Sequence, residues 1–170
     1  MATTETQQES MMMAKPHKEH QWLDKFCGDW TYEGEASMGP DTPVQMFRGT
    51  ESARSLGGLW YVLEGEGDMP GYPSAKTMLT IGYDPRKKKY VGTWIGSMSA
   101  QLWVYEGSVD ESGKILTLSA EGPDMSGAGK TAKYKDVTEF VSDCHRVLTS
   151  HMLGEDGQWH QFMKSHYRRK

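Results

Sequence analysis

The amino-acid sequence predicts an all-β protein, an antiparallel up-and-down β-barrel of about ten strands with a short N-terminal helix. Three observations lead to this prediction. Short apolar segments recur along the chain, and 19 glycines help to separate them with turns. In the segments that can be aligned across a turn, polar and apolar residues alternate as in a strand with one buried face. A long meander also leaves two exposed edges unless it closes, so a closed barrel is expected.

The first expected element is a helix over residues 17–28. Trp22, Leu23 and Phe26 fall on one face, and Gly28 suits a C-terminal cap. The strands that follow are predicted at about residues 29–38, 44–55, 59–67, 76–83, 90–96, 101–109, 114–121, 132–141, 145–153 and 158–168. Residues 1–14 are polar and contain no aromatic residue, so we expect a disordered tail there and a single barrel domain over residues 15–170.

Composition excludes several classes of function. A net charge of -4 gives no electrostatic basis for binding nucleic acid or an anionic membrane. No run of about 18 apolar residues occurs, so no membrane-spanning helix is expected. The first residues lack the basic and apolar regions of a secretion signal, and two cysteines do not form a disulfide framework, so a cytoplasmic protein is expected.

The barrel interior is predicted to be lined by aromatic and apolar side chains. An even-numbered turn around residues 84–89 places Leu79 on the same face as Trp94, and a similar turn around residues 110–113 places Trp103 with Leu118. The candidate pocket residues are Trp30, Arg54, Leu79, Ile81, Trp94, Trp103, Tyr105, Leu118, Met152 and Met163.

Non-covalent binding of a small hydrophobic ligand is the leading functional hypothesis, because a barrel of about ten strands has room for one. Arg54 beside Glu64 is a candidate anchor for an acidic group of the ligand. The alternatives are a filled barrel that acts as a structural or dimerising module, and an enzyme that uses an inward carboxylate or histidine. No catalytic residue is assigned, because no serine or cysteine nucleophile motif is found, and the sequence favours a non-enzyme. A homodimer is retained as a hypothesis.

Four of the six histidines, His145, His151, His160 and His166, lie between residues 144 and 167. They could not all bind one ion, since His145 and His151 are about 20 Å apart along a strand. In the register that an even turn gives, all four share a face opposite the one that holds Leu148, Met152, Trp159, Met163 and Tyr167. We therefore expect these histidines to point outward, with at most two cross-strand pairs, His151 near His160 and His145 near His166. The leading hypothesis needs no cofactor and no metal; its alternative is a haem or metal held by His151, His160 or His166.

Several segments resemble a known family. "GDWTYEGE", "GTESARSLGGLWYVLEGEGDMPG" and "IGYDPRKKKYVGTWIGSM" are similar to the family called domain of unknown function 1579, and the resemblance extends over nearly all of the chain from about Lys15. That family has no established activity, and it is placed among the lipocalin-like (calycin) β-barrels, so the resemblance implies a lipocalin-like barrel. A weaker similarity of the Gly28–Ala36 segment to nitrobindin-like haem barrels implies the haem alternative, with a histidine on a late strand as the iron ligand.

Overall fold

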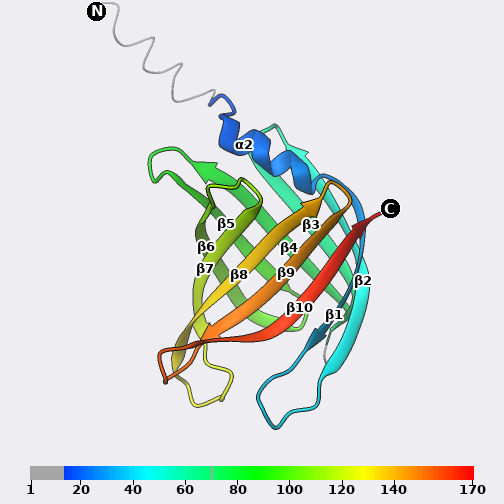
Figure 1. The fold of residues 1–170 in the computed structure, drawn as a ribbon, viewed down its shortest axis with the longest axis vertical. Coiled ribbons are helices and arrows are strands. Elements are labelled where there is room, and N and C mark those ends of the chain that lie inside the picture. Colours follow the sequence, from blue (N-terminus) through cyan, green and yellow to red (C-terminus); the bar gives the residue numbers. More distant parts are fainter. Residues whose placement is uncertain (1–13, 70) are drawn as a thin grey trace, which may run out of the picture.

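The computed structural model describes residues 14–69 and 71–170, and in these ranges ten strands form one closed antiparallel barrel. Each strand pairs with its neighbours in the sequence, and β1 closes the barrel against β10 (Figure 1). The predicted all-β, up-and-down barrel with a short N-terminal helix is confirmed. The tail predicted over residues 1–14 lies, except for Ala14, outside the described residues.

The helical segment predicted over residues 17–28 consists of a helix α2 (Lys18–Trp22) that continues as a 3-10 turn η1 (Leu23–Phe26). The strands are β1 (Gly28–Ala36), β2 (Gln45–Leu56), β3 (Trp60–Met69), β4 (Tyr72–Asp84), β5 (Lys89–Gly96), β6 (Ser99–Val109), β7 (Ile115–Pro123), β8 (Thr131–Ser142), β9 (His145–Leu153) and β10 (Trp159–Arg169). Each of them overlaps a predicted strand. The largest difference is at the hairpin of β3 and β4, which continues until Met69 pairs with Tyr72.

Side chains alternate between the interior and the solvent along each strand, as the two-residue period of a strand requires. In β1, Trp30, Tyr32, Gly34 and Ala36 are buried, and the residues that alternate with them are exposed. Glycines are needed where this interior is crowded. A Cβ atom at Gly49 or Gly67 would collide with the phenol oxygen of Tyr32, so these two glycines make room for that ring.

The helical segment closes one end of the barrel, and the loops β1–β2, β7–β8 and β9–β10 lie at the opposite end (Figure 1). Leu23 and Phe26 of η1 are buried in a core with Trp30, whose indole Nε1 donates a hydrogen bond of 2.8 Å to the Phe26 carbonyl. Tyr61 donates a hydrogen bond of 2.7 Å to Asp24. Burial and this carboxylate raise the pKa of Tyr61 to about 12. The closed end is therefore packed and its polar groups are paired.

Candidate functional site: a cavity inside the barrel

Between the packed end and the opposite loops, the barrel encloses a cavity of about 380 Å³. Every strand contributes at least one lining side chain, and Met38 and Met125 contribute from the loops β1–β2 and β7–β8. Cavities of this size are typical of sites for small molecules. The cavity is the first candidate for a functional site.

The half of the cavity wall formed by strands β3–β7 is mainly apolar. Each of these strands contributes a large apolar side chain to it: Leu63, Leu79, Trp94, Trp103 and Leu118. The first four lie side by side in the sheet. The Trp103 ring contacts Tyr134 edge to face, with ring centroids 5.0 Å apart. Gly122 allows this position, because a Cβ atom there would strike the Trp103 ring. This half offers a rigid apolar surface to a ligand.

The other half of the wall contains a buried ion pair. Arg146 of β9 is only 3% exposed, and its guanidinium binds the carboxylate of Glu51 from β2. The same guanidinium lies 3.9 Å from the ring centroid of Tyr167 and 4.8 Å from that of Trp30. Its Nε atom has no hydrogen-bond partner among the described residues. Burial of this kind is tolerated because the charge is paired and the flat faces of the guanidinium are covered by rings.

A second acid, Asp136 of β8, lies in the same half and is partly buried. The hydroxyl of Tyr105 donates to its Oδ2 at 2.6 Å, and the hydroxyl of Ser150 donates to its Oδ1 at 2.5 Å. Burial raises the pKa of the Asp136 carboxyl, although the two hydroxyl donors oppose this change. Burial also raises the pKa of Tyr105, and the adjacent Asp136 carboxylate adds to the effect. Asp136 is held in place by neutral donors and has no ion-pair partner among the described residues.

Methionines surround the open end of the cavity. Met38, Met69, Met125 and Met163 all line it, together with Phe162. Unbranched thioether side chains adapt to ligands of different shape more easily than branched ones do. This end of the cavity is therefore the part of its wall that can adjust to different shapes.

The structure brings together six of the ten predicted pocket residues around the cavity: Leu79, Trp94, Trp103, Tyr105, Leu118 and Met163. The prediction is wrong for Trp30 and Ile81, which are fully buried in the core of the closed end and do not border the cavity. Met152 lies opposite Tyr134 in the sheet but is not among the lining residues.

The prediction for Arg54 is also wrong. Its side chain lies outside the barrel, 58% exposed and 3.8 Å from Glu64. A two-residue turn would have paired Arg54 with Tyr61, but three residues separate the paired Leu56 and Trp60, so Arg54 pairs with Val62 instead. Positive φ angles at Gly57 and Gly58 permit this longer turn.

The histidines lie outside the cavity. His145 and His166 form the expected pair on the outer face, with 3.0 Å between Nε2 and Nδ1. His151 lies opposite Gln161 and so does not pair with His160, which binds Asp156 at the edge of the open end. These positions do not fit a haem or a metal inside the barrel, because none of the predicted ligands His151, His160 and His166 borders the cavity. In the described part of the chain, no cluster of three or more metal-binding side chains occurs.

A bulge in β10 between Gln161 and Met163 explains why Trp159 does not face the barrel interior as predicted. The extra residue reverses the alternation before it, so Trp159 lies on the outer face under the ammonium of Lys135, with 4.4 Å from Nζ to the ring centroid. The prediction that Trp159 shares the inward face with Met163 is therefore wrong. Phe162, at the bulge, reaches the cavity instead.

The polar half of the cavity was missed at the sequence level. The sequence predicts the strands that carry Asp136, Arg146 and Ser150, but it contains no motif that marks them as site residues. One signal was available, since Arg146 is two residues before Leu148 and therefore on the face predicted to point inward. Its partner Glu51 is 95 residues away in the sequence, and no local pattern connects the two.

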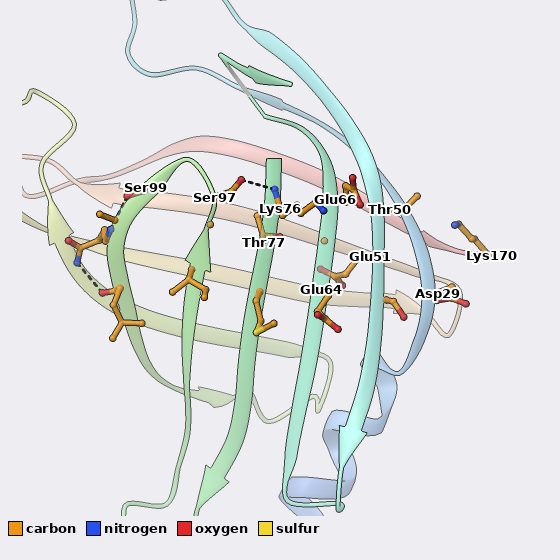
Figure 2. A pocket seen from close by; sticks show the side chains of 18 residues that line it. Asp29, Thr50, Glu51, Glu64, Glu66, Lys76, Thr77, Ser97, Ser99 and Lys170 are labelled. Atoms are coloured by element: carbon orange, nitrogen blue, oxygen red, sulfur yellow. Dashed lines mark hydrogen bonds between the residues drawn. The ribbon is translucent and has the colours of Figure 1, made fainter. Parts of the chain in front are cut away.

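A second hollow lies on the outer face of the barrel, across strands β2–β6. Figure 2 shows that its labelled polar side chains, among them Glu64, Glu66 and Lys76, are spread along several strands and do not converge on one point. Large apolar side chains are exposed nearby on the same strands, including Trp60, Ile95, Leu102 and Val104. Nothing in the structure shows what covers them, and the homodimer stays a prediction. The open outer hollow is a weaker candidate site than the cavity.

The described residues contain no helix that is both long and apolar enough to cross a membrane. A cytoplasmic location stays a prediction.

The fold and the cavity together define a lipocalin-like β-barrel with an accessible interior. Residues 15–169 match the family described as "Protein of unknown function (DUF1579)", and the chain belongs to that family. This confirms the resemblance seen in the sequence motifs. No curated protein matches the chain.

Two solved structures are similar to the barrel. The crystal structure of Rv2717c from M. tuberculosis has a TM-score of 0.58 at 11% sequence identity, with 92% of this chain and 99% of that chain covered. The S-type phycobiliprotein lyase CPES from Guillardia theta has a TM-score of 0.55 at 12% identity, with 88% and 92% covered. At such low identities these similarities show a shared fold and nothing about a shared ligand.

Proposed function

We propose that this protein binds a small molecule non-covalently in the barrel cavity. The observation that carries the proposal is the cavity of about 380 Å³, with one mainly apolar wall and one wall that presents buried polar groups. Ligand sites commonly combine these two features, because apolar surface supplies most of the affinity and a few polar groups fix the orientation. The body of the ligand lies against Leu79, Trp103 and Leu118, and its polar end faces Asp136 and Arg146.

Apolar burial and a few hydrogen bonds in such a site supply enough free energy for micromolar binding. A ligand that buries about 250 Å² of apolar surface gains about 6 kcal/mol at 25 cal/mol per Å². Micromolar binding corresponds to about 8 kcal/mol, so one or two hydrogen bonds at the polar wall supply the rest. The apolar wall is already rigid, which limits the entropy lost on binding.

Access is through the open end. The opposite end is blocked by the buried side chains of Leu23, Phe26 and Trp30, so a ligand enters past the methionine-lined loops. The ligand does not need to displace any packed core residue to reach the cavity.

The proposal is tested by filling the cavity. In Leu118→Trp, the larger side chain occupies cavity space beside Asp136, its partner on β8, and we expect the affinity for an apolar fluorescent dye to fall at least tenfold. Thr117→Trp is the matched control, because residue 117 precedes Leu118 on β7 and points to the other face of the sheet. Thermal unfolding of both variants shows whether the barrel still folds. Equal dye affinity in folded Leu118→Trp and the parent protein would contradict binding in the cavity.

The natural ligand is sought separately by native mass spectrometry of protein purified from its own host. A co-purifying small molecule that is absent from Leu118→Trp and present in Thr117→Trp supports the proposal and identifies the ligand class directly. A small molecule retained equally by both variants contradicts binding in the cavity.

A further inference from the structure

The charges of the cavity wall are unevenly balanced. Among the described lining residues, three carry a carboxyl or a guanidinium group: Glu51, Asp136 and Arg146. Two are acids and one is a base, and neither lysine nor histidine lines the cavity. A ligand entering the barrel therefore meets one more acidic group than basic groups.

The single base is already engaged. The guanidinium of Arg146 binds Glu51, and the rings of Tyr167 and Trp30 lie close to it. A ligand carboxylate could bind Arg146 only in competition with Glu51. Breaking a buried ion pair leaves an uncompensated charge, which costs several kcal/mol. The wall thus disfavours a ligand with an anionic end.

The second acid lacks a cation. Asp136 accepts hydrogen bonds from the hydroxyls of Tyr105 and Ser150, and each carboxylate oxygen retains a free lone pair. The titratable groups that face Asp136 or share the cavity wall with it come from several strands: Tyr105 on β6, Tyr134 on β8, Tyr32 on β1, Tyr167 on β10, Glu51 on β2, and Arg146 on β9, with His151 of β9 on the other face. Of these, Arg146 is neutralised by Glu51, and His151 lies on the outer face. The charge of an ionised Asp136 is left for a ligand to balance.

The rings around the cavity add a second, independent feature. Tyr32, Trp94, Trp103, Tyr105 and Tyr167 all line it. The faces of aromatic rings attract cations, and cages of such rings are the usual way in which proteins bind ammonium groups. The chain uses the same interaction within its own interior, where the guanidinium of Arg146 lies 3.9 Å from the Tyr167 ring centroid.

We propose that the ligand of this cavity is an amphipathic amine, bound as its ammonium ion with the charged end beside Asp136 and the apolar body against the β3–β7 wall. This inference rests on the proposed function and specifies its ligand class. The ammonium donates hydrogen bonds to the free lone pairs of the ionised Asp136 carboxylate. Where Asp136 is protonated in the free protein, binding releases that one proton to solvent, and no covalent bond forms or breaks.

The test compares three probes with the same apolar body: 2-naphthylethylamine, 2-naphthylethanol and 2-naphthylacetate. Titration calorimetry at pH 7 should show the amine binding at least tenfold more tightly than the alcohol, and the carboxylate binding most weakly. Where Asp136 is protonated in the free protein at pH 7, calorimetry of the amine in two buffers of different ionisation enthalpy should show that proton released, whereas the alcohol should release none.

Asp136→Asn keeps the size of the side chain and removes its charge, so the amine should lose its advantage while the affinity for the alcohol changes by less than threefold. Glu66→Gln on the outer face of β3 is the matched control, since it removes an acidic charge away from the cavity. It should leave the order of the three probes unchanged.

The outcomes separate the two proposals. If the carboxylate binds as tightly as the amine, or if the preference for the amine persists in Asp136→Asn, the ligand class is wrong and binding in the cavity stands. If the apolar dye and all three probes fail to bind the folded protein, the proposed function fails as well.

Discussion

The two ends of the barrel are built from the same ten strands but use their inward side chains differently. At the closed end, Trp30, Tyr61 and Ile81 are almost completely buried and meet the helical segment. At the open end, Trp94, Trp103 and Tyr105 have equally large side chains, yet they border a cavity. The difference is that a helical segment outside the sheet covers one end, whereas none of the described residues forms such a plug at the other. Aromatic content alone therefore does not distinguish a core from a binding site, and the two ends should respond in opposite ways to mutation.

The largest effect on stability is expected at the closed end. Trp30→Ala removes a fully buried side chain and its hydrogen bond to Phe26, and we expect a loss of about 4 to 5 kcal/mol in the free energy of unfolding. Trp103→Ala should cost about 2 kcal/mol less, because one side of that ring already faces the cavity, but it should weaken dye binding at least tenfold. Urea denaturation measures the stability of the two variants, and dye titration measures their affinity for the dye. Equal losses of stability would show that the open end is packed as tightly as the closed end.

The next largest effect lies at the boundary between the two ends. Arg146→Met leaves the carboxylate of Glu51 without its partner inside the barrel, and we expect a loss of about 3 kcal/mol. The double substitution Arg146→Met with Glu51→Leu removes both charges and should recover most of that loss. Denaturation of the two single variants and the double variant completes a thermodynamic cycle. A double variant as unstable as the sum of the single variants would show that the pair has no direct coupling.

A smaller effect concerns pH. Burial raises the pKa of Asp136 in the folded state above the ordinary value of 3.8. A raised pKa means that the folded state holds the proton more tightly, so this group favours folding at low pH. Stability is lost as the pH rises from 3.8 towards the folded-state pKa.

Asp136→Asn should therefore show a flatter dependence of unfolding free energy on pH than the parent protein, with the largest relative gain at neutral pH. Denaturation series at several pH values check this. The same slope in both proteins would mean that folding does not raise the pKa of Asp136.

The smallest effect on stability is expected at the entrance. Met125→Ala removes a side chain of the β7–β8 loop that is only partly buried, so we expect a loss below about 1 kcal/mol. The rate of dye entry should nevertheless change, because this side chain stands at the way in. Stopped-flow fluorescence measures that rate, with Met46→Ala on the exposed outer face of β2 as the control. Identical entry rates for Met125→Ala and the control would place the entrance elsewhere.

The fold was predictable from the sequence because it depends on local signals. Alternation along the strands and glycine-containing turns placed all ten strands, and they identified Leu79, Trp94, Trp103 and Leu118 as inward residues. The failures come from single-residue shifts. A three-residue turn at Gly57 moves Arg54 to the outside, and a bulge near Phe162 moves Trp159 to the outside. Because the period of a strand is two residues, one extra residue reverses which side chains point inward.

The depth of a residue inside the barrel was not predictable in the same way. Trp30 and Ile81 point inward as expected, but they lie between the cavity and the helical segment, in the core of the closed end. Their height depends on how the strands are staggered around the closed sheet, and that stagger accumulates over all ten pairings. The contact between Glu51 and Arg146 is likewise a result of closure, since it joins β2 to β9 across the interior.

The seam between β1 and β10 also has a consequence for how the chain folds. Thr31 pairs with Arg168, a separation of 137 residues, so the last strand must be in place before the first can complete its pairing. Contacts between such distant residues require a large loss of chain entropy before they become favourable, and they slow folding. Hairpins such as β4–β5 can form early and independently. Closure of the β1–β10 seam is therefore the step at which we expect folding to be rate-limited, and until then both seam strands are open edges that can pair with another chain.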